Sequence, residues 1–417
     1  MKILEMPPYY LPEQISSTHL TSDLTVGFIN QGFTIENYVP TPCRGISEEI
    51  RKKYAKILYE ELYDGKVKII RFPIWKEGRN PIGRAFRYVV INIIQAQKGC
   101  KAKDINIIIG GSTPPIQGLL CSFVAKRLSR KYSRQIPFVY LLQDVFPDSL
   151  VTTGLAKKEG VLWKIGRVIE NTVYKNANKI IVISQGIKRN IMAKGVPEEK
   201  IEVISNWIDL DSVHPVNRRD NKLINEFSID PDKFLVVYAG NFGAAQGADI
   251  ILKVAERLKD ESNIQFVIFG GGAYFEKAKR EAEKLSNVFI HELMPADRIS
   301  EVYSLGDVAL ITCKPGTGNA GMPSKTWSIM ACNTPIIASF DTDSDLADVI
   351  RDSGAGVCVE PGDVDALINS VQKFYVDNKF NKKSDYDMRS YVRMNASKET
   401  CVKKYIDVIK NLMSDYA

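Results

Sequence analysis

Two glycine-rich stretches have residue types and spacing suited to holding a phosphate. The first, residues 238–247, has the sequence Tyr-Ala-Gly-Asn-Phe-Gly-Ala-Ala-Gln-Gly and leads from a β-branched run into a helical pattern. Gly240, Gly243 and Gly247 allow close approach of the backbone, and the N–H groups of a helix N-terminus attract anions. A glycine-rich turn without a ligand explains this stretch equally well when it is taken alone.

The second stretch, residues 314–325, has the sequence Lys-Pro-Gly-Thr-Gly-Asn-Ala-Gly-Met-Pro-Ser-Lys and precedes another helical pattern. We expect Ser324 to be the N-cap of that helix and Lys325 to lie in its first turn. A cation there interacts unfavourably with the helix dipole, at a cost of about 0.3–1 kcal/mol, unless an anion is bound. Lys325 therefore indicates a phosphate more strongly than the glycines do, and a solvated lysine is the alternative.

Other kinds of chemistry find little support. Residues 269–272 (Phe-Gly-Gly-Gly) lack the G-x-G-x-x-G spacing of a nicotinamide site, and no Walker, H-E-x-x-H or G-x-S-x-G motif occurs. The three histidines are far apart and suit structural roles, and the seven cysteines form no C-x-x-C pair that would suggest zinc. The aspartates of residues 341–345 (Asp341, Asp343 and Asp345) are not accompanied by the glycine and the distant Glu of a calcium-binding loop. We therefore expect them to cap the following helix, with Asp345 near the donor.

Short β-branched runs alternate with helical patterns along nearly the whole chain. Predicted strands cover residues 2–6, 34–39, 66–72, 104–110, 137–142 and 179–184, then 234–239, 264–269, 288–291, 308–312, 335–339 and 356–359. Predicted helices cover residues 19–31, 48–62, 115–131, 163–175 and 186–193, then 248–259, 273–285, 296–305, 324–331, 344–353, 364–377 and 397–414. This alternation predicts an α/β fold with two doubly wound sheets that bind ligands at the carboxyl ends of their strands.

A chain of 417 residues is long enough for two domains. We place an N-terminal Rossmann-like domain at residues 1–210 and a C-terminal one at residues 211–396, because turn-forming residues cluster without periodicity between Ser205 and Pro231. The last helix, within residues 397–417, is expected to pack back on the N-terminal domain. No window approaches the roughly 18 consecutive apolar residues of a membrane-spanning helix.

Charge is divided unevenly along the chain. Residues 1–200 carry 31 Lys and Arg against 17 Asp and Glu, a net charge of +14, whereas residues 201–417 carry 25 against 32, a net charge of −7. Nucleic acid, an acidic lipid leaflet and a phosphorylated acceptor would all be attracted to the first half. Alternating basic and aromatic residues favour the lipid surface. These residues are Arg71, Phe72, Trp75, Lys76, Arg79, Arg84, Phe86, Arg87 and Tyr88.

Several segments, taken in order, resemble the retaining glycosyltransferases of family 4, which have the GT-B fold of two Rossmann-like domains facing a central cleft. The resemblance is closest to the branch with the WbuB-like enzymes of bacterial surface-polysaccharide synthesis. The matching segments are Tyr9–Glu13, Ser112–Pro115, Gln143–Leu150, Val182–Ser184, Val203–Asp209, Tyr238–Gly247, Met322–Lys325, Met330–Ile337 and Val359–Asp363. They cover residues 1 to about 370 in family order.

The resemblance implies a donor site in the C-terminal domain, retention of configuration and no metal. The donor-binding residues that we assign are Gly240, Asn241, Phe242, Gly243, Gln246, Gly247, Gly270, Leu293, Met294, Lys314, Asn319, Gly321, Met322, Pro323, Ser324 and Asp345. The base would lie at residues 293–294 and the diphosphate at residues 321–325. We assign catalytic roles to Lys325, Asp144 and Glu13; Lys325 would stabilise the departing diphosphate, with Lys314 as the alternative.

Two departures from the family keep other functions open. The Glu-x7-Glu signature is replaced by Ala320 and Ser328, and the loop that usually carries an Arg and a Lys has Asn241 and Gln246. A sugar-nucleotide epimerase of the same fold and a non-catalytic partner subunit are the two alternatives.

As partners we expect a nucleotide-sugar donor, with UDP favoured by the branch, and a saccharide acceptor linked to polyprenyl diphosphate. The acceptor would bind the N-terminal domain. We also expect an anionic membrane surface, no nucleic acid, no cofactor and no metal. The protein would lie in the cytoplasm, peripheral to the inner face of the plasma membrane.

Overall fold

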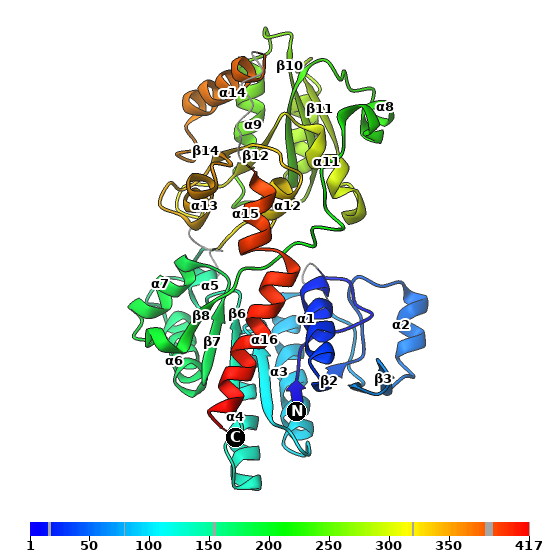
Figure 1. The fold of residues 1–417 in the computed structure, drawn as a ribbon, viewed down its shortest axis with the longest axis vertical. Coiled ribbons are helices and arrows are strands. Elements are labelled where there is room, and N and C mark those ends of the chain that lie inside the picture. The colour runs from blue at the N-terminus through cyan, green and yellow to red at the C-terminus, as the bar shows by residue number, and fades with distance from the viewer. Residues whose placement is uncertain (16–17, 79, 153–155, 319–320, 380–386, 417) are drawn as a thin grey trace. The chain divides into compact units, whose positions relative to one another are not determined.

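The computed structural model describes residues 1–417 apart from 16–17, 79, 153–155, 319–320, 380–386 and 417. The chain divides into two compact units: residues 1–205 with 401–417 form unit 1, and residues 206–400 form unit 2. Each unit is built around one sheet with helices on both faces (Figure 1). The last helix, α16 (Lys398–Ser414), lies beside α1 (Thr18–Asn30) in unit 1, where Gly27 leaves room for Val402.

Unit 1 contains an eight-stranded sheet in the order β3-β4-β2-β1-β5-β6-β7-β8. Its strands are β1 (Lys2–Glu5), β2 (Thr34–Pro40), β3 (Tyr59–Leu62), β4 (Val67–Phe72), β5 (Ile107–Gly111), β6 (Phe138–Leu142), β7 (Lys179–Val182) and β8 (Ile201–Val203). Neighbouring strands pair in parallel, except that the edge strand β3 is antiparallel to β4. The strand order reverses between β1 and β5, which places the expected ligand crevice beyond their carboxyl ends.

Three long helices cover one face of this sheet. They are α3 (Pro81–Gly99), α4 (Gln117–Tyr132) and α6 (Val161–Asn176), and α4 packs against both of the others. The helices α1 and α16 cover the other face, because right-handed crossovers that run in opposite directions place their helices on opposite sides. The unit is completed by α2 (Glu48–Tyr54), α5 (Asp148–Thr152), α7 (Gln185–Ala193) and the 3₁₀ turn η1 (Glu198–Lys200).

Unit 2 contains a fully parallel six-stranded sheet in the order β11-β10-β9-β12-β13-β14. The strands are β9 (Phe234–Asn241), β10 (Ile264–Gly271), β11 (Val288–Glu292), β12 (Val308–Thr312), β13 (Ile336–Ser339) and β14 (Gly356–Val359). One face is covered by α9 (Asp249–Arg257), α10 (Phe275–Ala282) and α14 (Val364–Lys379). The other is covered by α8 (Lys222–Glu226), α11 (Ile299–Leu305), α12 (Lys325–Ala331), α13 (Asp345–Ser353) and α15 (Met388–Asn395). Apolar packing on both faces explains why these strands are nearly continuous apolar runs.

All twelve predicted strands occur, and β9 to β14 begin within one residue of their predicted starts. The predicted helix at residues 48–62 is wrong beyond Tyr54, because its end pairs as the edge strand β3. The long helix α3 is not predicted, since its β-branched run at residues 89–94 is typical of a strand. Its start signals are Asn80, whose side chain accepts from two N–H groups of the first turn, and Pro81 at the first helical position.

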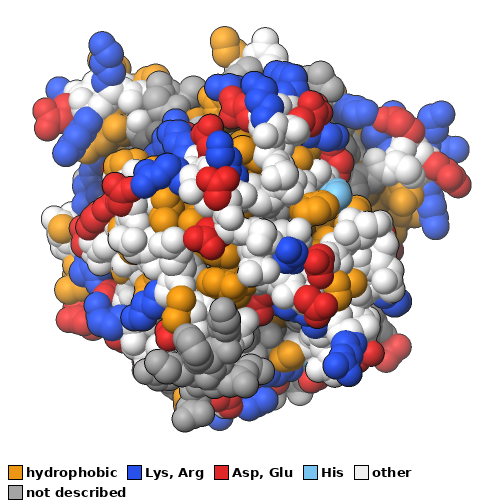
Figure 2. Space-filling view, turned by 90° about the horizontal axis from the view of Figure 1, so that it is seen from above, with side chains coloured by type: hydrophobic (Ala, Val, Ile, Leu, Met, Phe, Trp, Pro, Cys, Tyr) orange, Lys and Arg blue, Asp and Glu red, His pale blue; other side chains and the backbone are white. Residues whose placement is uncertain are grey.

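No helix within the described residues is both long and apolar enough to cross a lipid bilayer. Basic and acidic side chains are interspersed over the face of the molecule drawn in Figure 2. An attraction to anions therefore depends on local groups of side chains rather than on a field of one sign over that face.

Candidate functional site

The two glycine-rich stretches lie side by side in unit 2. One follows β9 and the other follows β12, the neighbouring strands at which the strand order reverses. Their loops are joined at the carbonyl of Ala245, which accepts hydrogen bonds from the Lys314 N–H at 2.9 Å and from the Thr317 hydroxyl at 3.2 Å. Both stretches therefore contribute to one site, at the position where doubly wound sheets bind ligands.

Gly247 sets the contact between these two loops. Its φ is +57°, and a Cβ at this position would lie 2.8 Å from the carbonyl oxygen of Cys313. Backbone conformation and available space thus both require glycine. This requirement comes from the packing of one loop on the other and holds without any ligand.

Lys325 begins α12, and its ammonium group turns back toward β9. The Nζ atom lies 4.4 Å from the centre of the Tyr238 ring, a cation–π contact. Gly240 leaves space for this group, because a Cβ there would collide with Nζ. The side chain is half-buried, and burial lowers the pKa of Lys325 to about 8. No carboxylate among the described residues forms an ion pair with it, so the site holds an uncompensated cation.

Ser324 occupies the N-cap position of α12 but makes no capping hydrogen bond with its side chain. Its backbone is helical, with φ −58° and ψ −30°. A capping serine needs an extended backbone so that its hydroxyl can face the N–H groups of the first turn. The prediction that Ser324 caps this helix is therefore wrong as far as its side chain is concerned.

Asp341 follows β13 and fixes the loop after β12 from the neighbouring strand. Its carboxylate accepts hydrogen bonds from the N–H groups of Gly316, at 2.9 Å, and Gly318, at 2.7 Å. The cap of α13 is Ser344 instead, whose hydroxyl accepts from an N–H of the first turn. The prediction that Asp341 caps this helix is therefore wrong. In the part of the chain that the structure describes, no group of three His, Cys, Asp or Glu side chains is placed to hold a metal ion.

The two neutral side chains of the first loop, Asn241 and Gln246, lie around Gly243. A Cβ at Gly243 would be 2.5 Å from Gln246 Oε1 and 2.8 Å from Asn241 Nδ2. The Asn241 oxygen also faces Gly272, whose φ of +108° and lack of space for a Cβ both require glycine. These amides pack against backbone and bring no charge to the site.

Phe242 and Gly270, which we assigned to the donor, belong to the packing beneath the first loop. The Phe242 ring contacts the rings of Tyr238 and Phe275, with centroids 5.5 and 5.7 Å apart. A Cβ at Gly270 would lie 2.6 Å from the Phe275 ring and 2.8 Å from the Phe242 ring. These residues shape the loop, and direct contact with a donor stays a prediction for both.

The remaining assigned residues lie around the same end of the sheet. Leu293 is exposed just beyond β11, close to Gly271 of β10, and Met294 packs against the core. Residues 321–323 are half-buried and precede Ser324, and Asp345 lies in the first turn of α13. Asn319 and Ala320 fall outside the described residues.

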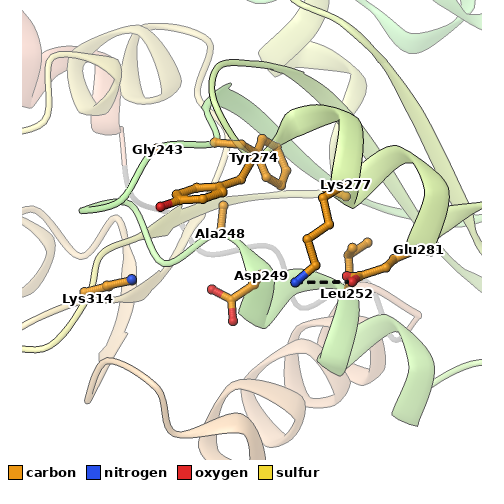
Figure 3. A pocket seen from close by; sticks show the side chains of 10 residues that line it. Gly243, Ala248, Asp249, Leu252, Tyr274, Lys277, Glu281 and Lys314 are labelled. Atoms are coloured by element: carbon orange, nitrogen blue, oxygen red, sulfur yellow. Dashed lines mark ion pairs between the residues drawn. The ribbon is translucent and has the colours of Figure 1, made fainter.

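A pocket of about 270 Å³ lies beside the first loop, between the start of α9 and one side of α10. Figure 3 shows Lys314 at one end, the Lys277–Glu281 ion pair at the other, and Asp249 between them. It is lined by Phe242, Gly243, Ala248, Asp249, Leu252, Tyr274, Lys277, Ala278, Glu281 and Lys314. Three of these were assigned to the donor from the sequence, whereas Tyr274 and Lys277 carry no motif that would single them out.

Glu13, a predicted catalytic residue, is buried in unit 1. Its Oε1 accepts from the N–H groups of Cys43 and Arg44, at 2.8 and 2.9 Å, and its Oε2 accepts from that of Tyr10 at 3.1 Å. Burial raises the pKa of Glu13. These bonds tie the loop after β1 to the loop after β2, so Glu13 has a structural role, and its catalytic role stays a prediction.

Asp144 follows β6, and its exposed carboxylate lies 3.5 Å from the hydroxyl of Thr113, which follows β5. It is accessible to a ligand, and its catalytic role also stays a prediction. Glu5, at the end of β1, was not singled out from the sequence, where it is merely the acid that ends an apolar run. Burial raises the pKa of Glu5 to about 7, and a perturbed pKa at the carboxyl end of a strand is the signal that would have marked this residue.

The basic residues at positions 71–87 are engaged within unit 1. The ion pairs are Arg71–Glu60, Lys76–Glu48, Arg84–Glu77 and Arg87–Glu77, and both Arg71 and Arg87 are buried. Arg79 lies outside the described residues. Nearby glutamates therefore compensate much of the charge of this segment, and its contact with a lipid surface stays a prediction.

Two family models match the chain one after the other. Residues 21–212 match Glycosyltransferase Family 4, and residues 220–393 match Glycosyl transferases group 1. The chain is 26% identical over 349 residues to "Probable glycosyltransferase WbjE" of Pseudomonas aeruginosa, with 81% of each chain covered. It is also 26% identical over 275 residues to "Putative colanic acid biosynthesis glycosyl transferase WcaI" of Escherichia coli K12, with 64% of this chain and 66% of WcaI covered.

Solved structures resemble the whole chain. Sucrose-phosphate synthase from Thermosynechococcus elongatus aligns over 99% of both chains with a TM-score of 0.75 at 15% identity. Anabaena HepE in complex with UDP and glucose aligns over 98% of this chain and 99% of its own, with a TM-score of 0.68 at 14% identity. At such identities the likeness shows the fold alone, which is GT-B. The two family models, which match residues 21–212 and 220–393, show that the chain belongs to the glycosyltransferases. The predicted fold class and family are confirmed.

Proposed function

We propose that this glycosyltransferase is retaining and metal-independent, and that it moves a sugar from a UDP-sugar to a lipid-linked saccharide in the synthesis of a bacterial surface polysaccharide. The observation that carries the proposal is the uncompensated Lys325 ammonium group at the strand reversal of unit 2. Two relatives support the substrate class: WcaI is named for colanic acid biosynthesis, and the HepE structure contains UDP and glucose.

The chemistry requires positive charge at this position. Breaking the bond between a sugar and a diphosphate builds negative charge on the leaving oxygen, and without a metal the protein must compensate it. Lys325 supplies that charge in a half-buried place, where electrostatic interactions are stronger than in water. Asn241 and Gln246 are neutral, so Lys325 carries most of the compensation, with Lys314 at the edge of the same loops.

The acceptor, a saccharide linked to polyprenyl diphosphate, binds unit 1 at the cytoplasmic face of the membrane. The net charge of +14 in residues 1–200 supports an attraction to its phosphates. We assign the contact with the acceptor hydroxyl to Asp144, which is exposed beyond the carboxyl end of β6.

Donor turnover tests the proposal against its two alternatives. The purified chain is incubated with UDP-, GDP- and dTDP-sugars, with and without a polyprenyl-diphosphate-linked acceptor, in the presence and absence of EDTA. We expect transfer that depends on the acceptor, prefers a UDP-sugar and survives EDTA. Interconversion of the sugar nucleotide without acceptor would indicate an epimerase, and no turnover of any donor would indicate a non-catalytic subunit. Activity that is lost in EDTA and restored by magnesium or manganese would contradict metal independence.

A further inference from the structure

One side of unit 1 exposes many apolar side chains. On α3, Ile82, Phe86, Val89 and Ile93 recur at helical spacing along the solvent side, and Ile82 is 80% and Phe86 61% exposed. Trp75 is exposed as well and stacks on Phe86, with ring centroids 5.9 Å apart. A surface helix of a soluble domain normally turns polar residues to water on this side.

The neighbouring helices extend this strip. On α6 the exposed apolar residues are Val161, Leu162, Ile165 and Val168, of which Val161 is 74% and Val168 67% exposed. On α4, which packs between α3 and α6, Phe123 is exposed. We call the outer surface of these three helices the α3–α4–α6 face. Monomeric soluble proteins rarely expose so many neighbouring apolar side chains unless the surface binds something.

The α3–α4–α6 face also carries cations without exposed acids. Glu170 is the one acidic residue in the sequences of the three helices, and it is buried. The exposed cations are Lys126, Arg127, Arg130 and Lys131 on α4 and Lys164 and Lys175 on α6. On α4 they follow Phe123 along one side of the helix, and within the described residues no carboxylate pairs with them. The partner of this face must therefore be both apolar and anionic.

The opposite face of the same sheet gives an internal comparison. There α16 turns Lys403, Lys404, Asp407, Lys410 and Asn411 to solvent, with both signs of charge and no exposed apolar residue. The combination of apolar and purely basic side chains thus belongs to one side of unit 1.

We propose that the α3–α4–α6 face docks onto the surface of an anionic lipid bilayer. This docking rests on the proposed function, because an enzyme that uses a lipid-linked acceptor must reach the membrane. Apolar side chains enter the boundary between headgroups and acyl chains, and the cations contact lipid phosphates. A second copy of the chain fits less well, because in a two-fold contact the face would meet itself and oppose cations to cations.

Vesicle co-sedimentation of the full chain tests this. The apolar variant combines Phe86→Gln, Ile165→Gln and Val168→Gln, and the basic variant combines Lys126→Gln, Arg127→Gln, Arg130→Gln and Lys131→Gln. The control for the apolar variant combines Val26→Gln, Leu58→Gln and Val376→Gln. The control for the basic variant combines Lys52→Gln, Lys53→Gln, Lys403→Gln and Lys404→Gln. All these side chains are exposed, so the fold should be retained. Vesicles contain phosphatidylcholine alone or mixed with phosphatidylglycerol.

We expect the wild type and both controls to bind the phosphatidylglycerol vesicles, and each test variant to bind them about tenfold or more weakly. Test variants that bind like their controls, or a wild type that binds neither kind of vesicle, would overturn the proposal. So would a wild type that is dimeric in size-exclusion chromatography and becomes monomeric in the apolar variant, since the face would then bind a second copy. Transfer to a water-soluble acceptor is measured in parallel, because failure of docking and failure of the proposed transfer then appear in different assays.

Discussion

Lys325 is the residue whose surroundings say most about the ligand. Burial beside Tyr238 makes the ammonium form less favourable than in water, which is why the pKa of Lys325 falls to about 8. A bound diphosphate next to Nζ would reverse this effect, because an opposite charge at short range favours the protonated form. Donor binding and protonation of Lys325 are therefore linked.

Replacing this lysine should slow the transfer step. We expect Lys325→Ala to lower kcat by about 10²–10³, because charge that develops in the transition state loses its compensation. The fold should persist and donor affinity should change less. Lys314→Ala, at the edge of the same site, is the comparison and should cost less. If Lys325→Ala stays within about threefold of the parent, which corresponds to roughly 0.7 kcal/mol in the barrier, Lys325 does not have this role.

The pKa of Lys325 also predicts how binding depends on pH. Below about pH 8 the side chain is protonated and attracts the diphosphate; above it the charge is lost, so affinity for UDP should fall by up to about tenfold per pH unit. Isothermal titration of UDP binding between roughly pH 7 and pH 9.5, a range that spans this pKa, measures the dependence. Lys325→Arg keeps its charge over this range and should remove the dependence. An equally steep fall in Lys325→Arg would assign the titration to another group.

At the scale of elements, the site depends on two loops that follow neighbouring strands. The sequence could predict the strands and both loops, because β-branched runs and glycine spacing are local signals. It could not predict that Asp341 holds the second loop or that Lys325 lies over Tyr238, since these contacts join positions far apart in the chain. The missed helix α3 has a different explanation, because its start signals, Asn80 and Pro81, are local but its β-branched run has the composition of a strand.

Gly247 offers a test of the loop arrangement. Gly247→Ala should cost about 1–2 kcal/mol for the left-handed backbone and more for the contact with the Cys313 carbonyl, and it should raise the donor KM by separating the loops. Gly32→Ala is the matched control, because Gly32 has a φ of +79° but open space around its Cβ position. It should lower stability without changing KM. An unchanged donor KM in Gly247→Ala would show that the packing of these loops does not shape the donor site.

At the scale of the whole molecule, the excess of positive charge in the first half of the chain can be interpreted only when the exposed cations are known. Most of the cations first singled out are paired with glutamates, whereas those on α4 are exposed beside apolar residues. Net charge therefore predicted an anionic partner for the first half of the chain but could not identify the surface. That distinction depends on which side chains the fold brings into contact.

The most direct test of the central claim is the thermal stability of the full chain with nucleotides. A ligand at 100 times its dissociation constant adds about 2.7 kcal/mol of stability. We predict that UDP and a UDP-sugar raise Tm, that uridine raises it much less, and that Lys325→Met, which keeps the length of the side chain but not its charge, loses most of the UDP shift. A chain that no nucleotide diphosphate stabilises, or a Lys325→Met variant that UDP stabilises as fully as the wild type, would contradict a donor site built around Lys325.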